Sequence, residues 1–457
     1  MADAVRERQA PFDPKQFETF RFVAREIADD GRVTLRYALD DELSFVEEFE
    51  LPEGTRVTDS DRERVDGLLA LLHWVAGVSY FKTAAPPAVR SEVGAPPPAA
   101  ARLLEALYSE GLGEFAYVNQ LPRLPRPAFD SAPITSARPT LGQPGGPRVL
   151  VPVGGGKDSV VALEIVRRSG LDMSLFSVGD AVPIARTAEV AGVPRLVVKR
   201  RIDPGMGELN RSGALKGHVP VTAIVTCVAM LTAALHGFDT VAMANERSAS
   251  QGNLAWDGVD VNHQFSKSLR AERLLREATA ELAPGMETFS LLRPASELGI
   301  ARAFAGMPNY HHAFTSCNAV FRLDPELRAT SWCTDCPKCR FVFLALAPFT
   351  DPEHLRDVFG RDLLADEAQF EGFALLTATG GNKPFECVGE EQESLAAIRL
   401  LADDVRWRDH ATVKRLVAEV LPQFPESSGR PADVLALSDD HEVPEALLTH
   451  AHAVLGA

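Results

Sequence analysis

Alternating hydrophobic and polar positions near the start of the chain predict a small antiparallel sheet. Between residues 17 and 51, the stretches FRFVAREI and GRVTLRYALDD place apolar side chains at about every second position, the period of a half-buried strand. Residues 29–31, Asp-Asp-Gly, are typical of a turn. Helices are predicted over 64–78 (RVDGLLALLHWVAGV) and 99–109. We therefore expect an N-terminal α+β domain over residues 1–120.

The hydrophobic pattern changes after a segment rich in proline, glycine, serine and threonine. Residues 121–148 are predicted to be a linker. Beyond them, the strand-like stretches VLVPV, LDMSLFSVG and PRLVVKR alternate with helical stretches such as SVVALEIVRRSG. This alternation predicts an α/β domain with a parallel sheet over residues 149–345. Residues 346–457 are expected to be an α-rich C-terminal region that contains the loop TATGGNKPFECVGE.

Charge and composition exclude several kinds of partner. The 457-residue chain carries a net charge of −16 and has a pI of about 5.2, so we expect no nucleic-acid or membrane partner. The start, MADAVRERQAPFD, lacks the apolar region of a secretory signal, which predicts a cytoplasmic protein. The longest apolar stretch, 219–235, is short for a spanning helix and contains three threonines. A buried core helix is therefore the favoured interpretation.

A glycine-rich loop follows the VLVPV strand and precedes a helix. Its glycines allow backbone N–H groups to approach an anion, and the helix N-terminus adds partial positive charge. Asp158 can hold Mg²⁺ against phosphates or cap the helix. The spacing fits neither a Walker A loop nor a dinucleotide-binding loop. A turn that uses glycine only for its geometry is the alternative. The predicted nucleotide-binding residues are Gly154, Gly155, Gly156, Lys157, Asp158 and Ser159.

This loop resembles the SGGxDS signature of the PP-loop ATP pyrophosphatases, which cleave ATP between its α- and β-phosphates. Gly154 stands where that family usually has serine, so one hydroxyl donor is lost while the backbone cradle is kept. The resemblance implies an adenine nucleotide alpha-hydrolase-like fold with helices on both faces of a parallel sheet. It also implies that adenine is received by backbone groups at Ser177 and Val178, where the second strand ends.

A second segment implied by the resemblance follows the strand DTVAMA, at the carboxyl edge of the sheet. Here Asn245, Glu246 and Arg247 are expected to contact the nucleotide. Glu246 would be a second Mg²⁺ carboxylate beside Asp158, and Arg247 would clamp a phosphate. The alternative is a solvated ion pair between Glu246 and Arg247.

A cysteine cluster predicts a structural zinc site. Cys333, Cys336 and Cys339 are spaced so that one turn can wrap a tetrahedral ion, and Cys317 precedes them. The arrangement resembles the zinc-binding tail of the PP-loop enzyme 7-cyano-7-deazaguanine synthase. An iron–sulfur cluster, unliganded thiols in a tight turn and a redox-active cysteine pair remain alternatives.

A resemblance over residues 17–400 points to one family. The segments LLALLHWVAGVSYFKTAAP, GLGEFAYVNQL, VPVGGGKDSVVALE, MANERSAS, NYHHAFTSCNAVFR and WCTDCPKCRFVFLALAPF are similar to those of the glycopeptidyl-glutamate epimerases. Using ATP and Mg²⁺, those enzymes convert the terminal L-glutamate of UDP-MurNAc-L-Ala-L-Glu to the D form during peptidoglycan synthesis. They would act after a ligase that adds L-glutamate.

The resemblance gives a chemical reason for an ATP site in an epimerase. The α-proton of a free carboxylate is hard to remove, because the resulting dianion is unstabilised. An acyl-adenylate neutralises the carboxylate and lets the carbanion delocalise as an enol. Removing the proton from one face and returning it to the other inverts the centre. Hydrolysis then releases product, AMP and pyrophosphate, and no pyridoxal cofactor is expected.

The proton-transfer residues stay open at this stage, because a lone histidine is more often structural than catalytic. Cys387 lies in a glycine-rich loop beside Lys383, whose charge would favour a thiolate. Cys227 lies within an apolar helix and is expected to be inert. Lys267 and Arg322 are candidates for holding the acidic substrate. The candidate proton-transfer residues are Cys387, His218, His311 and His312.

Two other functions are compatible with the glycine loop alone. One is a PP-loop enzyme of the tRNA- or 7-deazaguanine-modifying type, but an RNA-binding member would show a basic face that this acidic chain lacks. The other is a nucleotide-binding module without catalysis. Gly154 supports that interpretation, whereas Asp158, Ser159 and Glu246 argue against it.

Overall fold

Residues 12–134, 147–322, 326, 328–379, 386 and 388–456 are described by the computed structural model. Within them, nine strands form one sheet: β1 (Thr19–Ile27), β2 (Arg32–Leu39), β3 (Leu43–Glu50), β4 (Ala88–Ser91), β5 (Val149–Pro152), β6 (Met173–Val178), β7 (Arg195–Arg201), β8 (Thr240–Met243) and β11 (Glu287–Ser290). Their order across the sheet is β11-β8-β5-β6-β7-β3-β2-β1-β4. Strands β9 (Leu254–Trp256) and β10 (Val259–Val261) form a separate hairpin.

The N-terminal strands confirm the predicted antiparallel sheet. Strand β1 pairs with β2, and β2 with β3, both antiparallel. The predicted turn contains Gly31, whose φ of 82° suits glycine and whose N–H donates to Ala28 O over 2.9 Å. Strand β4 then adds to the edge parallel to β1.

The parallel strands that were predicted further along the chain are also present. Strands β11, β8, β5, β6 and β7 are all parallel. Strand β7 also pairs antiparallel with β3, so that Phe49 lies opposite Arg200. The α/β class is confirmed, but the sheet is mixed because the N-terminal strands continue it. The division into separate domains stays a prediction.

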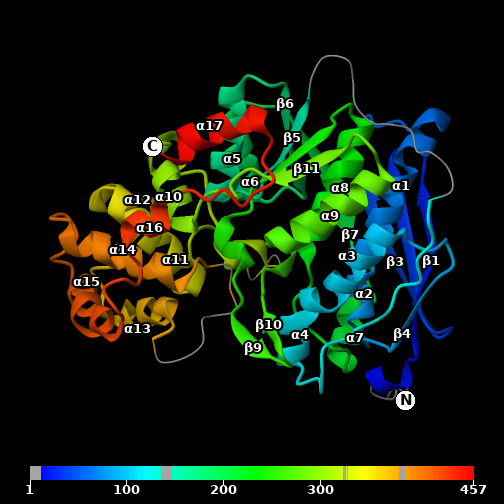
Figure 1. Ribbon diagram of the computed structural model, residues 1–457, viewed down its shortest axis with the longest axis horizontal. Coiled ribbons are helices and arrows are strands. Elements are labelled where there is room, and N and C mark those ends of the chain that lie inside the picture. The colour runs from blue at the N-terminus through cyan, green and yellow to red at the C-terminus, as the bar shows by residue number, and fades with distance from the viewer. Residues whose placement is uncertain are drawn as a thin grey trace, which may run out of the picture.

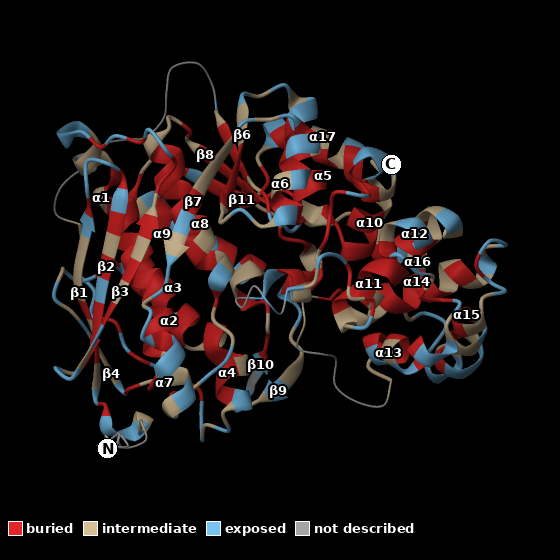
Figure 2. Ribbon diagram, turned by 180° about the vertical axis from the view of Figure 1, so that it is seen from behind, coloured by how far each residue is buried: buried red, intermediate tan, exposed pale blue. Residues whose placement is uncertain are grey.

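Alternate side chains of β5 face two hydrophobic cores, which places helices on both faces of this sheet. Leu150 belongs to the core shared with α1 (Asp59–Ala76), α3 (Pro98–Tyr108), α8 (Val221–Leu235) and α9 (Leu269–Leu282). Val149 and Val151 belong to the other core, with α5 (Lys157–Ser169), α10 (Glu297–Ala305) and α11 (Pro337–Leu346). Figure 2 shows buried residues along these helices. The alternation follows from the two-residue period of a strand.

The C-terminal part of the chain is helical, as expected. Figure 1 shows its helices grouped on the side of the molecule away from β1–β3. The last helix returns to pack against α5. The C-terminal helices are α12 (Pro352–Phe359), α13 (Phe370–Ala374), α14 (Glu391–Asp403), α15 (Ala411–Arg415), α16 (Pro431–Leu435) and α17 (Glu445–Leu455).

The remaining helices are α2 (Val78–Phe81), α4 (Gly113–Val118), α6 (Val182–Ala191) and α7 (Met206–Ser212). Helix α8 is the long apolar stretch of the sequence, and most of its side chains are buried, including Cys227. Across the described parts of the chain, every helix is too short or too polar to cross a bilayer. The prediction that α8 is a core helix is thereby confirmed.

Candidate active site

The glycine loop joins β5 to α5, and two of its glycines are required by close packing. Gly155 has a φ of +80°, and an added Cβ would lie 2.8 Å from Pro183 Cβ. A Cβ on Gly156 would lie 2.8 Å from Ser316 Oγ. The space around Gly154 is open, with nothing within 4 Å of its Cβ position. Position 154 can therefore accept the serine that the PP-loop signature usually has.

A cavity of about 390 Å³ lies at this loop, where β5, β6 and β8 end. Carboxyl ends of parallel strands are where open α/β sheets bind ligands. Most of the nucleotide-binding residues predicted from the sequence are therefore brought together. Those that line the cavity are Gly154, Gly156, Asp158, Ser159, Ser177, Val178, Asn245 and Glu246.

Lys157 does not line the cavity but is buried behind it. Its ammonium group makes ion pairs with Asp158 and with Glu297, the first residue of α10. Burial alone would lower the pKa of Lys157, but the two carboxylates raise it above its usual value. Burial would likewise raise the pKa of Glu297, but Lys157 and Lys338 lower it to about 2. Lys157 therefore holds Asp158 and Glu297 together, and its predicted contact with the nucleotide stays a prediction.

Glu246 is a buried carboxylate that also lines the cavity. Burial raises its pKa, and the charges of Glu297 and Asp158 raise it further, while Lys267 opposes them. Oxygen ligands from Asp158 and Glu246 suit a hard cation such as Mg²⁺. A divalent cation would compensate the crowded negative charge, so these residues fit the predicted metal.

Arg247 is directed away from the cavity. Its guanidinium donates to the backbone carbonyls of Val434 and Ala436 over 3.0 and 2.9 Å. It therefore ties the segment after β8 to the C-terminal helices. Among the described residues, the Arg247 guanidinium contacts these carbonyls and makes no ion pair with Glu246, and the predicted phosphate contact stays a prediction.

His311 and His312 do not line the cavity either. His311 is buried, with Nδ1 2.8 Å from His354 Nε2 and Nε2 3.0 Å from Phe304 O. His312 is exposed, and its ring lies 5.8 Å from that of His354. Both histidines therefore lie outside the cavity lining, and their part in proton transfer stays a prediction.

His218 belongs to a cluster with His263 and Glu114. The two imidazole rings lie 4.4 Å apart between centroids, and His263 Nδ1 contacts the Glu114 carboxylate. Burial and the nearby charges of His263, Lys267 and Lys82 together lower the pKa of His218 to about 4, although Glu114 opposes them. His218 is therefore neutral at pH 7.

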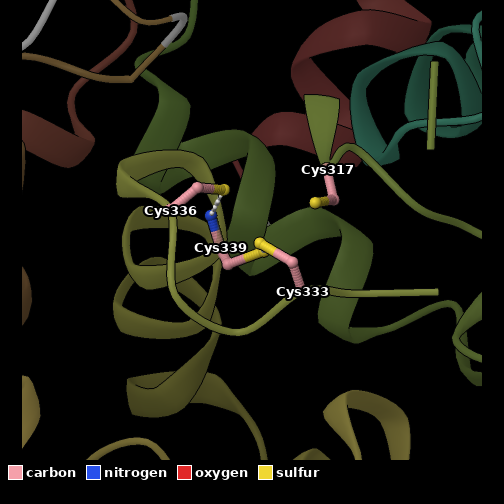
Figure 3. Close-up of side chains that lie close together, drawn as sticks. All are labelled: Cys317, Cys333, Cys336 and Cys339. Atoms are coloured by element: carbon pink, nitrogen blue, oxygen red, sulfur yellow. Dashed lines mark hydrogen bonds between the residues drawn. The ribbon is translucent and has the colours of Figure 1, made fainter. Parts of the chain in front are cut away.

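The four cysteines of the predicted zinc site converge, as Figure 3 shows. One sulfur from each residue lies within 4.8 Å of all the others. Cys333 Sγ and Cys339 Sγ are 3.7 Å apart, close to the separation of about 3.8 Å between thiolates on a tetrahedral zinc ion. Hydrogen bonds from Cys336 and Cys339 lower the pKa of the Cys317 thiol, which favours a thiolate. The donor set fits structural zinc.

The cysteine cluster lies next to the cavity. Ser316 and Asn318, which flank Cys317, both line this cavity. Thr315 N donates to Gly155 O over 2.8 Å, so the same segment also holds the glycine loop. The segment around Cys317 therefore contributes both to the cavity lining and to the position of the glycine loop.

Comparison with known proteins decides which family this site belongs to. Residues 11–291 match the family described as MurL N-terminal domain, and residues 313–430 match the MurL C-terminal domain. Three relatives are named UDP-N-acetyl-alpha-D-muramoyl-L-alanyl-L-glutamate epimerase. The chain belongs to this epimerase family.

These members of the epimerase family resemble the chain over nearly its whole length. The relative from Micromonospora is 45% identical, over 91% of this chain and 93% of its own. The relative from Salinispora tropica is 47% identical, over 89% of each chain. That from Xanthomonas oryzae pv. oryzae is 40% identical, over 95% of this chain and 97% of its own. The resemblance inferred from sequence segments is confirmed.

Sequence reasoning did not mark three titratable residues that lie beside the predicted site residues, and two residues that it did mark lie outside the described part of the chain. Glu114, His263 and Glu297 are single residues in segments far apart in sequence, without a motif spacing that would have marked them. Cys387 and Lys383 lie outside the described residues, so Cys387 stays a prediction. The adjacent Glu386 is described and accepts a hydrogen bond from Asn318 at the cavity wall.

Proposed function

We propose that the chain epimerises the terminal L-glutamate of UDP-MurNAc-L-Ala-L-Glu through an acyl-adenylate, with ATP consumed to AMP and pyrophosphate. The names of its relatives support the substrate and the inversion. The observation that carries the ATP requirement is the cavity in which the glycine loop meets Asp158 and Glu246. An epimerase that did not activate its substrate carboxylate with ATP would have no use for an anion-binding loop beside two carboxylates.

The nucleotide would bind as in a PP-loop enzyme. Phosphates would lie against the glycine loop and the N-terminus of α5, where backbone N–H groups point outward. Ser177 and Val178, at the end of β6, would meet adenine through backbone groups. Asp158 and Glu246 would hold Mg²⁺, which neutralises phosphate charge.

The acidic substrate would enter beside two lysines that line the cavity, Lys267 and Lys338. Their charges offset the local excess of carboxylates and would attract the glutamyl carboxylates. Lys267 Nζ is held by Gln264 Oε1 at 3.0 Å. Arg322, the other candidate, is exposed and follows Phe321, which lines the cavity.

Activation makes the inversion chemically accessible. The α-carboxylate attacks the α-phosphate of ATP, pyrophosphate leaves, and the resulting mixed anhydride has a carbonyl next to the α-carbon. When the α-proton is removed, the electron pair of the broken C–H bond delocalises into that carbonyl. A proton delivered to the opposite face gives the D centre, and water releases AMP.

Two further roles belong to this proposal. The four clustered cysteines would hold one structural zinc ion, because they form a closed thiolate set beside the cavity. The substrate would be supplied by a ligase that attaches L-glutamate to the nucleotide-linked L-alanine. This order follows because inversion must act on an L-glutamyl residue already in place.

An incubation with product analysis tests the proposed function. Protein, ATP, Mg²⁺ and UDP-MurNAc-L-Ala-L-Glu should yield D-glutamate after hydrolysis, with AMP and pyrophosphate in step with turnover. Nucleotide chromatography and chiral analysis of glutamate measure both. ADP as the nucleotide product, or inversion without ATP, would overturn the adenylate scheme. The same mixture with the L-alanyl nucleotide that lacks glutamate is the control and should form no AMP.

A further inference from the structure

Glu114, His218 and His263 form a cluster that neither the glycine loop nor the cysteine cluster explains. Glu114 lies in α4, His218 precedes α8, and His263 follows β10. One nitrogen or oxygen atom from each residue lies within 4.8 Å of the others, and all three side chains are only partly exposed. Three segments far apart in the sequence thus place two imidazoles and a carboxylate together.

This His/Glu cluster adjoins the nucleotide cavity. Val221 and Thr222, which line the cavity, begin the helix that directly follows the segment of His218. Lys267 also lines the cavity and lies on the segment that follows His263. The charge of Lys267 acts on His218 and also on Glu246, so one ammonium group is near both the cluster and a carboxylate of the glycine-loop site.

The contacts within the cluster favour proton transfer over metal binding. Lys267 and Lys82 both act on His218 as nearby positive charges, and they would repel a divalent cation. The Glu114 carboxylate is already engaged with His263 Nδ1. A carboxylate that accepts from one ring nitrogen leaves the other with its lone pair and fixes the orientation of the ring.

We propose that His263, oriented by Glu114, removes the α-proton of the activated glutamyl residue. His218 packs against the His263 ring and positions it. This assignment rests on the proposed acyl-adenylate function and identifies the residue that acts as the base in it. The Cα–H bond breaks, its electron pair moves into the adenylate carbonyl as an enolate, and the proton goes to His263 Nε2. Because the two imidazoles lie side by side, the cluster serves one face of the α-carbon.

The primary test uses the full-length protein and substrate carrying deuterium at the glutamate α-carbon. His263→Ala should lower inversion and loss of deuterium by roughly 10²–10⁴-fold, the usual cost of losing a general base. Substrate-dependent exchange of labelled pyrophosphate into ATP should persist, because adenylation precedes proton removal. Added imidazole should restore part of the inversion. Inversion at the parent rate, or equal loss of inversion and pyrophosphate exchange, would overturn the assignment.

Glu114 is tested as a positioning residue. Glu114→Gln should lower kcat for inversion by roughly 10²-fold, as when a carboxylate no longer orients a catalytic imidazole, with little change in KM. The deuterium isotope effect on kcat should rise, because proton transfer becomes slower than the other steps. Glu114→Asp should recover part of the rate. A loss confined to KM, or an unchanged isotope effect, would contradict this role.

A second histidine–carboxylate pair provides a matched control. His410 Nε2 lies 3.0 Å from Asp362 Oδ2 in the C-terminal helical region. His410→Asn should leave inversion and pyrophosphate exchange at parent rates. Failure of the adenylate scheme can be told apart from failure of the base assignment. If the parent loses deuterium without ATP, and this loss disappears in His263→Ala, the adenylate scheme is wrong and the assignment of His263 as the base stands.

Discussion

Lys157 and Glu297 form a buried ion pair that joins the first residue of α5 to the first residue of α10. Their side chains are 1% and 2% exposed. Lys157 also contacts Asp158, and Lys338 approaches Glu297 at 3.8 Å. The pair therefore fixes the helix start that carries Asp158 at the cavity.

Removing one partner of this pair should destabilise the protein. Glu297→Gln leaves the Lys157 ammonium buried with Asp158 as its remaining close carboxylate, and breaking a buried pair costs about 3–5 kcal/mol. Urea unfolding at pH 7 should show this loss. The pKa of Glu297 is lowered to about 2. The contribution of this carboxylate to the free energy of unfolding is therefore present above the unfolded-state pKa and is lost as the pH falls toward 2.

As the pH falls, the free energy of unfolding should therefore decrease less in Glu297→Gln than in the parent. Glu419→Gln, which removes the surface ion pair with Arg415, is the control and should leave the unfolding midpoint unchanged. Equal midpoints for Glu297→Gln and the parent would refute a stabilising role for the pair.

Adjacent glycines should respond in opposite ways to substitution. Gly154→Ser should keep adenylate formation within a few-fold of the parent, because the space there is open. Gly155→Ala should abolish it, because alanine is strained at φ +80° and its Cβ would lie 2.8 Å from Pro183 Cβ. Substrate-dependent pyrophosphate exchange measures both. Loss of exchange in Gly154→Ser together with retention in Gly155→Ala would reverse the predicted order.

Zinc should be bound at one ion per chain, as measured by elemental analysis of the purified protein. Cys336→Ser should lose zinc and lower the thermal midpoint, because a structural zinc site contributes folding free energy. Cys227→Ala is the matched control: Cys227 is buried in α8, apart from the cluster, so this variant should keep its zinc. An iron–sulfur absorption band, or full zinc content in Cys336→Ser, would contradict the assignment.

Glu393 should make stability fall as pH rises. Burial and the charges of Glu297 and Glu390 together raise the pKa of Glu393 to about 8, although hydrogen bonds from Ser248 and from the Glu390 backbone oppose the shift. Because the pKa is raised in the folded state, Glu393 contributes to the free energy of unfolding most fully below its unfolded-state pKa, near 4.5. This contribution is lost as the pH rises through about 8. The urea midpoint should therefore decline from pH 6 to pH 9.

Glu393→Gln should flatten this decline, because glutamine does not ionise. It should also lower the midpoint at pH 6, because both carboxyl oxygens accept backbone N–H groups, from Glu297 and Glu390, and glutamine has one acceptor oxygen. A decline of equal slope in the variant would assign the pH dependence to another group.

Local patterns predicted the strands, the glycine loop and the cysteine site, because each is encoded within a short segment. Residues such as Ser177 and Glu246 were indicated by the resemblance to PP-loop enzymes, and both line the cavity at the edge where the parallel strands end. The pairing of β3 with β7 was not predictable, since it depends on how distant segments pack. The same holds for Lys157, whose partner Glu297 lies on another helix, and for the contact of His263 with Glu114.

Deuterium exchange should depend on ATP if activation precedes proton removal. In D₂O, the D-glutamyl product should carry deuterium at the α-carbon, and recovered L-substrate should carry none when ATP is omitted. The reason is that a free carboxylate cannot stabilise the carbanion, whereas the adenylate carbonyl can. Mass spectrometry and proton NMR of the glutamyl residue measure the label, and a non-hydrolysable ATP analogue is the control.

Two outcomes of this exchange experiment, and two outcomes with variant proteins, separate the steps. Exchange without ATP would mean that the adenylate is not what acidifies the proton. Product that keeps all of its original hydrogen, even over a long time course, would remove the carbanion from the mechanism. Retention of pyrophosphate exchange in Cys387→Ala or His218→Ala, with inversion lowered by roughly 10²–10⁴-fold, would place those residues at proton transfer. Inversion at the parent rate in both variants would exclude Cys387 and His218 from proton transfer and would also contradict the positioning role that we propose for His218.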